Sequence, residues 1–305
     1  MKIFNCIPDI VQWRLTQVSR PVETIGFVPT MGCLHAGHIA LVNQSRKENS
    51  LTVVSIFVNP SQFAPGEDLD KYPKTLEADL DRLRDAGVDA VFVPTPAMLY
   101  PQGIPLDVTQ QRGPFVSVHG ISEVLEGRTR PNFFRGVATV VTKLFNIVSP
   151  DKAYFGQKDI QQFLVLETMV RELFMPVKLV MMPIVRDDSG LALSSRNRYL
   201  CPESAQLASA IYRGLQSAAS VIQNAADQVS RSEVEAAAYN HWNPLINSGD
   251  FKVDYLSIAE KSTLQELGPS ITKSKQIVLS CAVYVTDREN KATVVRLIDN
   301  ILIEN

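Results

Sequence analysis

Short apolar runs alternate with amphipathic segments through the first 185 residues of the chain. The run 51-LTVVSIFV-58 is β-branched and nearly continuous in apolar character, which is typical of a strand covered on both faces. Residues 75–87 instead place Leu76, Leu80 and Leu83 on one helical stripe. Alternating strands and helices at this spacing predict right-handed βαβ units and a parallel sheet. The predicted strands are 24–30, 51–58, 88–94, 152–156 and 176–185, and the predicted helices are 36–48, 75–87, 136–148 and 159–173.

The pattern changes after about residue 183. Two amphipathic helices come first, and three β-rich runs follow, the last two joined by the polar turn 286-TDREN-290. Helices followed by an antiparallel sheet predict a separate α+β domain. We therefore expect two domains, residues 1–182 and residues 183–305, with a loop-rich segment at 95–135 inside the first. The helices predicted in the second domain are 202–222 and 232–246, and its strands are 252–259, 276–285 and 292–299.

Composition and charge narrow the class of protein. The 305 residues are 45% hydrophobic and carry a net charge of −2, which gives no electrostatic reason to expect binding to nucleic acid or to an anionic membrane. No apolar run reaches the roughly 18 residues that a membrane span needs, and the start of the chain is too polar for a signal peptide. The four scattered cysteines are read as reduced thiols: Cys6, Cys33, Cys201 and Cys281. We expect a soluble, cytoplasmic globular protein.

The segment 29-PTMGCLHAGH-38 lies between the first buried strand and the first helix. In open α/β sheets, ligands bind beyond the carboxyl ends of the strands, and a helix N-terminus offers unpaired N–H groups that suit a phosphate. Gly32 permits a tight turn, and Gly37 removes a Cβ between His35 and His38. The two imidazoles share one face of the first helical turn and can donate hydrogen bonds to phosphate oxygens.

Other interpretations of the two histidines compete with phosphate binding. Zinc would need a third or fourth ligand, and no cysteine, histidine or carboxylate cluster occurs at a matching spacing. Histidines that pack in a core or cap a helix are common in general. A GxGxxG loop is absent, which argues against a hydride-transferring enzyme.

Three further polar segments follow predicted strands. In 57-FVNPSQF-63, Asn59 and Gln62 suit hydroxyl and carboxylate groups, although Asn-Pro is also an ordinary turn signal. In 156-GQKDIQQF-163, Lys158 supplies a point charge for phosphate, and Asp159 suits a helix N-cap or a ribose hydroxyl. The alternative there is a capped helix start with a solvated lysine.

The third segment is 186-RDDSGLALSSRNRYL-200, which carries Ser194, Ser195 and Arg196. Two hydroxyls and a guanidinium form a donor-rich loop that can close over a polyphosphate. By composition alone, a polar linker between domains explains the same residues. The arginines and aromatics of 128-RTRPNFFRG-136 would suit RNA, but the acidic balance of the chain weakens that interpretation.

The ordered set of motifs PTMG-x-LH-x-GH, FVNP-x-QF, FRGV-x-TVV, FG-x-KD-x-QQ and LALSSRN-x-YL resembles the pantothenate synthetase (pantoate–β-alanine ligase) family. The likeness to the wider HxGH nucleotidyltransferase superfamily rests on the first motif alone. The resemblance implies ATP-dependent condensation of (R)-pantoate with β-alanine to pantothenate, by way of a pantoyl adenylate, with release of AMP and pyrophosphate. It also implies Mg²⁺, a Rossmann-like N-terminal domain, a smaller C-terminal domain acting as a lid, and a homodimer.

The family resemblance also implies site residues. His38 matches the family's proton donor, and His35, Lys158 and Arg196 join it as catalytic donors of hydrogen bonds. Gln62 and Gln162 match the glutamines that hold pantoate, with Gln62 also near β-alanine. The residues expected to line the ATP site are Met31, Gly32, His35, His38, Gly156, Lys158, Asp159, Val185, Leu193, Ser194, Ser195 and Arg196.

The chain departs from the family pattern at two positions. Gln157 stands where the family commonly has glutamate, and Phe133 stands where it often has histidine, while Arg130 is retained. The protein ligand of Mg²⁺ is not evident, and Asp79 is one suggestion. The alternatives to a ligase are an adenylyltransferase, a non-catalytic nucleotide-binding module and a class I aminoacyl-tRNA synthetase. The short, slightly acidic chain lacks an evident anticodon-binding domain.

Overall fold

The computed structural model describes residues 1–19, 22–273 and 276–304. Contacts divide the chain into two compact units, Met1–Gly156 with Gln161–Pro183, and Gln157–Ile160 with Ile184–Asn305. The second unit includes a short turn, Gln157–Ile160, from the middle of the segment expected to form the first domain. None of the helices in the described ranges combines the length and the apolar character that crossing a membrane requires.

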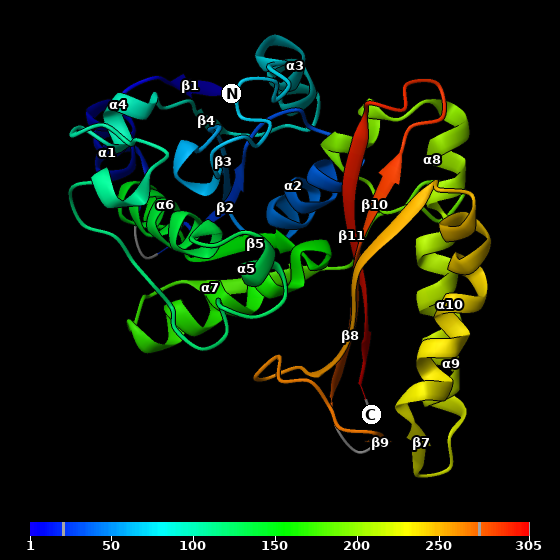
Figure 1. Cartoon of the computed structure of the whole chain (residues 1–305). Coiled ribbons are helices and arrows are strands. Elements are labelled where there is room, and N and C mark those ends of the chain that lie inside the picture. The colour runs from blue at the N-terminus through cyan, green and yellow to red at the C-terminus, as the bar shows by residue number, and fades with distance from the viewer. Residues whose placement is uncertain (20–21, 274–275, 305) are drawn as a thin grey trace. The chain divides into compact units, whose positions relative to one another are not determined.

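The first unit is built on a six-stranded sheet in the order β1-β4-β3-β2-β5-β6, and every neighbouring pair is parallel (Figure 1). Helices pack on this sheet, and the central strands are largely buried, with Phe27, Val53 and Val54 at 0% exposure. The predicted parallel α/β sheet is confirmed. Its strands are β1 Lys2–Phe4, β2 Ile25–Thr30, β3 Leu51–Ile56, β4 Ala90–Phe92, β5 Lys152–Gly156 and β6 Lys178–Met182.

The helices of this unit agree with the prediction at most places. The helix predicted at 136–148 begins earlier, at Phe133, and the loop-rich segment 95–135 contains two single-turn helices. The helices are α1 Ile7–Gln17, α2 Ala36–Glu48, α3 Leu76–Asp85, α4 Pro96–Leu99, α5 Glu126–Thr129, α6 Phe133–Val148 and α7 Ile160–Glu172, and the 3₁₀ turns are η1 Pro60–Gln62, η2 Val108–Gln110 and η3 Gln157–Asp159.

The second unit packs two long helices against a three-stranded antiparallel sheet in the order β11-β10-β8 (Figure 1). Trp242 is fully buried in the shared core, and its indole N–H donates to the carbonyl oxygen of Ala210. The predicted α+β character is confirmed. The elements are η4 Ser195–Tyr199, α8 Pro202–Ala208, α9 Ala210–Asn224, β7 Gln228–Ser230, α10 Arg231–Asn247, β8 Phe251–Glu260, β9 Ser270–Thr272, β10 Ile277–Thr286 and β11 Val294–Ile303.

The single helix predicted over 202–222 is wrong. The segment forms two helices that meet at Ser209, whose hydroxyl donates to the carbonyl oxygen of Gln206 at 2.6 Å. A serine hydroxyl that bonds its own backbone competes with the helical ladder. The amphipathic pattern continues across this interruption, so periodicity alone does not reveal it.

A buried carboxylate fastens the loop between β2 and α2 to helix α3. Asp79 is 1% exposed, and its oxygens accept the backbone N–H groups of Cys33 at 2.7 Å and Leu34 at 2.8 Å. The hydroxyl of Thr75 donates to the same carboxylate at 3.0 Å. Gly32 adopts φ +81°, and a Cβ there would lie 3.2 Å from an Asp79 oxygen. A side chain at position 32 would therefore be strained by the backbone conformation and crowded against the carboxylate.

Replacing Asp79 by Asn should loosen this loop. One acceptor oxygen becomes an NH₂ group that faces backbone N–H donors, so at least one buried donor loses its partner. We expect Asp79→Asn to lower the free energy of unfolding by about 1–3 kcal/mol. Chemical denaturation measures the loss. Asp81→Asn on the same helix is the matched control, because Asp81 is 70% exposed and pairs with Arg84. Equal losses of unfolding free energy in the two variants would show that the Asp79 carboxylate does not hold the loop.

An ion pair joins two turns of the second unit. Arg288 donates to both oxygens of Asp250, at 3.0 and 2.6 Å, and the Ser248 hydroxyl donates to the same carboxylate. The guanidinium beside it lowers the pKa of Asp250 to about 2. An unfolded aspartate titrates near 4, so the folded state prefers the charged form.

This pKa shift predicts a dependence of stability on pH. Because the folded pKa lies below the unfolded value, the ion pair stabilises the fold above pH 4 or so, and its contribution is lost as the pH falls towards 2. The difference in melting temperature between the wild type and Asp250→Asn should be largest above that range and should shrink below it. Calorimetry between pH 2 and pH 6 checks this. A difference in melting temperature that stays constant over this range would exclude titration of Asp250 as its cause.

Candidate active site

His35 and His38 cap helix α2 reciprocally. The Nδ1 atom of His35 accepts the backbone N–H of Gly37 at 3.1 Å, and the Nδ1 atom of His38 accepts the backbone N–H of His35 at 3.2 Å. The two ring centroids lie 4.1 Å apart. The chain thus uses two imidazoles where a serine and a glutamate usually form a capping box.

The capping bonds determine the tautomer of both rings. A ring nitrogen that accepts a backbone N–H carries no proton, so each neutral imidazole of His35 and His38 holds its proton on Nε2. Nε2 is then a hydrogen-bond donor at the N-terminus of a helix, where anions are favoured. Capping and phosphate donation, which the sequence presented as alternatives, are compatible in this geometry.

No metal cluster accompanies the histidines. Within the described ranges, no group of three or more His, Cys, Asp or Glu side chains is arranged to hold a metal ion. Asp79 lies next to the histidine loop, but its oxygens accept N–H and O–H donors. Its suggested binding of Mg²⁺ stays a prediction, and the structure gives it a role in holding the loop.

The turn after β3 carries a buried scaffold residue, Asn59, and a half-buried residue, Gln62. Asn59 is 1% exposed, accepts hydrogen bonds from Ser61 and from the Tyr100 hydroxyl, and donates to the carbonyl oxygen of Gly136. Burial raises the pKa of Tyr100 to about 12, which keeps it a neutral donor. Asn59 also donates to the Gln62 amide oxygen at 3.0 Å. The half-buried Gln62 therefore turns its NH₂ group away from Asn59.

Gly136 explains one motif whose purpose the sequence did not reveal. A Cβ at this position would lie 2.2 Å from the carbonyl oxygen of Ser61, so only glycine lets helix α6 approach the turn this closely. The FRGV motif therefore sets the position of the segment that carries Gln62.

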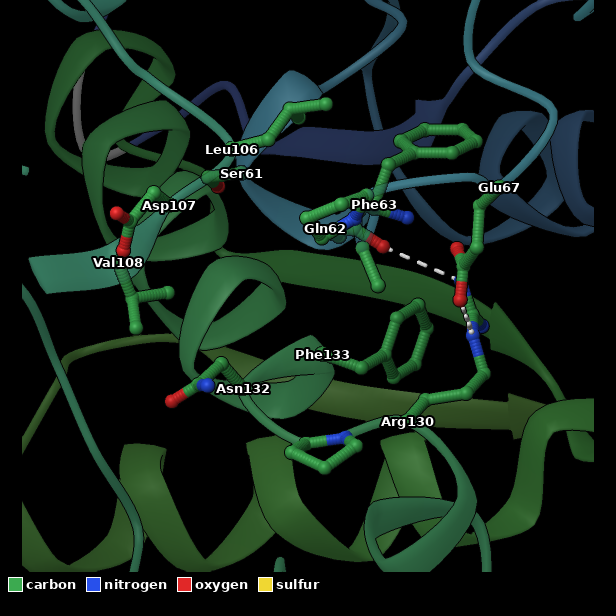
Figure 2. Close-up of a pocket in the computed structure, with 13 residues that line it drawn as sticks. Ser61, Gln62, Phe63, Glu67, Leu106, Asp107, Val108, Arg130, Asn132 and Phe133 are labelled. Carbon is green, nitrogen blue, oxygen red and sulfur yellow. Dashed lines mark hydrogen bonds and ion pairs between the residues drawn. The ribbon is translucent and has the colours of Figure 1, made fainter.

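A pocket of about 320 Å³ opens beside Gln62 (Figure 2). Arg130 lies along its wall and donates to both oxygens of Glu67, at 2.9 and 2.7 Å, and to the backbone oxygen of Gln62 at 3.2 Å. The ring of Phe133 stacks on the guanidinium at 3.9 Å. Sequence analysis missed Glu67, whose position in a loop gives no signal. Phe133 supports Arg130 through a cation–π contact, which gives the departure from the family histidine a structural role.

The paired glutamines at the start of α7 also have different roles. Gln161 is 3% exposed, accepts the N–H of Glu126, and donates to the carbonyl oxygens of Ile121 and Val124. It fastens the 121–126 loop to the helix. Gln162 is half-buried and belongs to the first unit, like Gln62.

The Gly156–Asp159 segment, which is predicted to contact ATP, combines an unpacked glycine with a half-buried lysine. A Cβ on Gly156 would meet no atom within 4 Å, so internal packing does not require glycine there. The Lys158 side chain is 19% exposed, and its ammonium lies 3.9 Å from the Asp159 carboxylate. Met31 is half-buried at the end of β2 in the first unit.

Residues 185–196 form an ordered hairpin within the second unit. The N–H of Leu193 donates to the carbonyl oxygen of Val185 at 3.0 Å, and the Ser194 hydroxyl accepts the N–H of Arg196 at 3.3 Å. Arg186 forms a double hydrogen bond with Asp299, at 2.6 and 2.8 Å. The unit therefore combines two predicted phosphate-binding segments, residues 157–159 and 185–196, with Ser195 half-buried in the latter.

Comparison with known proteins agrees with these motifs. A sequence model of the pantoate-beta-alanine ligase family matches residues 2–302. The chain is 61% identical to the pantoate–β-alanine ligase of Saccharomyces cerevisiae, over 99% of this chain and 100% of that protein. It is 44% identical to the pantothenate synthetase of Coprothermobacter proteolyticus, with 95% of each chain covered.

Solved structures give the same result. Pantothenate synthetase from Thermus thermophilus superimposes with a TM-score of 0.84 at 39% identity, over the whole of both chains. Pantoate-beta-alanine ligase from Francisella tularensis, complexed with beta-gamma ATP and beta-alanine, gives a TM-score of 0.75 at 32% identity, over 100% of this chain and 98% of that one. The chain described here belongs to the pantoate–β-alanine ligase family of enzymes.

Proposed function

We propose that the protein condenses (R)-pantoate with β-alanine at the expense of ATP, through a pantoyl adenylate, and releases AMP and pyrophosphate. The observation that carries this proposal is the pair of Nε2–H donors of His35 and His38 at the N-terminus of α2. They are suited to an anionic phosphate. The Francisella tularensis relative, which is complexed with beta-gamma ATP and beta-alanine, supports both of these substrates.

The first half-reaction needs positioning and charge stabilisation. Pantoate is a carboxylic acid with a pKa near 4, so it is already ionised at neutral pH and needs no general base. Its oxygen must lie in line with the α-phosphorus while negative charge spreads over the phosphate oxygens. We propose that hydrogen-bond donors stabilise this negative charge. They belong to Lys158, His35, His38, Ser194, Ser195 and Arg196. Met31, Gly32, Gly156, Asp159, Val185 and Leu193 complete the ATP site.

The glutamines suit the acid substrates. We assign Gln62 and Gln162 to pantoate, because neutral amides can bind a carboxylate and hydroxyl groups together. Gln62 also borders the pocket, and we place it near β-alanine as well, as the family resemblance implies. Mg²⁺ would arrive with the triphosphate, as it commonly does. The described residues form no acidic cluster suited to a protein cage for it, and no protein ligand is assigned.

His38 is the proposed hydrogen-bond donor to the leaving group of the second half-reaction. The ammonium of β-alanine loses a proton to solvent, and the free amine attacks the carbonyl of the adenylate. The tetrahedral intermediate then releases a second proton from nitrogen to solvent as its C–O bond to phosphate breaks and AMP leaves. A hydrogen bond from Nε2–H of His38 to the departing phosphate would stabilise that charge. The adenylate is a mixed anhydride that water destroys, so we assign residues 183–305 the role of a lid over the 1–182 domain. We also expect a homodimer in the cytoplasm.

AMP formation tests the overall reaction. Purified protein should produce AMP from ATP and Mg²⁺ only when both pantoate and β-alanine are present. Chromatography of the nucleotides, with each acid omitted in turn, checks this. Release of a dinucleotide would indicate an adenylyltransferase, and AMP formed without either acid would overturn the proposal.

Removing the His38 imidazole should slow both half-reactions. We expect His38→Ala to reduce turnover ~10²-fold or more, because the phosphate loses a hydrogen-bond donor at the reacting end. Rapid-quench measurement of AMP formation checks the rate, and calorimetry checks the fold. His119→Ala is the matched control, because that imidazole is 86% exposed and pairs with Glu123. A His38→Ala enzyme with normal turnover would remove His38 from the mechanism.

A further inference from the structure

The Asn300 side chain is fully engaged with the backbone of the Gln157–Lys158 turn. Its Nδ2 group donates to the carbonyl oxygens of Gln157 at 2.9 Å and Lys158 at 3.0 Å. Its Oδ1 atom accepts the side-chain amide of Gln157 at 3.1 Å. Asn300 is 2% exposed, so water does not compete for these bonds. A buried amide with every partner in place holds its surroundings in one arrangement.

Strand β11 gives Asn300 this position. Consecutive strand residues point to opposite faces of a sheet, so Asp299 and Asn300 diverge. Asp299 lies across from Cys281 on the helix-covered face and binds Arg186 of the 185–196 hairpin. Asn300 lies across from Ser280 on the other face and binds the 157–158 turn. Two neighbouring residues of one strand therefore hold both predicted phosphate-binding segments of the unit.

We propose that Asn300 is a positioning residue that fixes the Lys158 ammonium for the nucleotide phosphates. The proposal rests on the function proposed above, in which Lys158 binds phosphate. A lysine side chain has four flexible bonds, so a fixed backbone is needed to limit where its charge lies. Asn300 binds the carbonyl oxygen of Lys158 itself and that of the preceding residue, which restricts both peptide planes.

Gln157 completes the set of hydrogen bonds by which Asn300 holds the 157–158 turn, which we call the Asn300 brace. The two backbone carbonyl oxygens require the NH₂ end of Asn300, so its Oδ1 must face Gln157. An amide at position 157 donates to that oxygen, whereas a glutamate, which the family commonly has, could only accept. Glutamate here would face an acceptor or would pull the Asn300 amide away from the backbone. The Gln157 departure and Asn300 therefore form one matched pair.

Two variants test the brace. Asn300→Ala removes three hydrogen bonds. Gln157→Glu disturbs a single hydrogen bond, and the side chain that it changes is half-buried. The second variant therefore keeps the test available if the first folds poorly. Hydrogen exchange of the 157–160 backbone amides should rise in both variants, with β10 unchanged. This readout does not depend on the reaction. Unchanged exchange at 157–160 in both variants would exclude the brace.

Kinetics then test what the brace does. We expect Asn300→Ala to lower kcat/KM for ATP by about 10- to 100-fold, with a smaller effect of Gln157→Glu in the same direction and a small effect on KM for β-alanine. The decisive comparison adds Asn300→Ala to an enzyme that already carries Lys158→Ala. If Asn300 acts through Lys158, the second substitution should reduce kcat/KM for ATP little further. Equal losses from Asn300→Ala in the two backgrounds would overturn the positioning role.

Failure of the two proposals can be distinguished. A wild-type protein that makes no AMP from the three substrates contradicts the proposed function. An active wild type whose folded Asn300→Ala variant keeps normal kinetics for ATP contradicts only the role of Asn300.

Discussion

The buried Asp79 carboxylate is the constraint on which the histidine loop depends. It binds two successive backbone N–H groups, at Cys33 and Leu34, immediately before His35. The loop therefore delivers His35 to the N-cap of α2, and the cap in turn takes up the Nδ1 atoms of both histidines. The protons remain on Nε2 as a consequence. A carboxylate that touches no substrate in the proposed mechanism thus determines which nitrogen of each imidazole can donate.

Motif residues divide into buried ones that hold the scaffold and half-buried ones that we propose to contact a ligand. Within the FVNPSQF and GQKDIQQF motifs, Asn59 and Gln161 are buried and satisfied by backbone groups, whereas Gln62 and Gln162 are half-buried. Asn59 holds the turn that carries Gln62, and Gln161 holds the 121–126 loop against the helix that carries Gln162. Because a proposed ligand contact and its support are adjacent in the sequence, each motif is recognisable as a unit.

Much of the fold was predictable from periodicity, because parallel strands buried on both faces are continuous apolar runs. The three-residue strands β1, β4, β7 and β9 are too short to show a period, so the pattern does not reveal β1, β7 and β9 and makes β4 too long. The predicted site residues came partly from motifs at strand ends and partly from the family resemblance. Their supports did not, because Glu67, Asp299 and Asn300 lie far away in sequence and carry no local pattern.

The attachment of Asn300 to Gln157 joins residues 143 positions apart in the chain. A ribosome makes the turn at 157–159 long before it makes β11. The nascent chain can therefore complete the parallel sheet of the first unit while the Lys158 turn still lacks its fastening. Non-local contacts of this kind form late, after loop closure has been achieved. Competence to hold a nucleotide would then arise as one of the last events of folding, when the final strand docks.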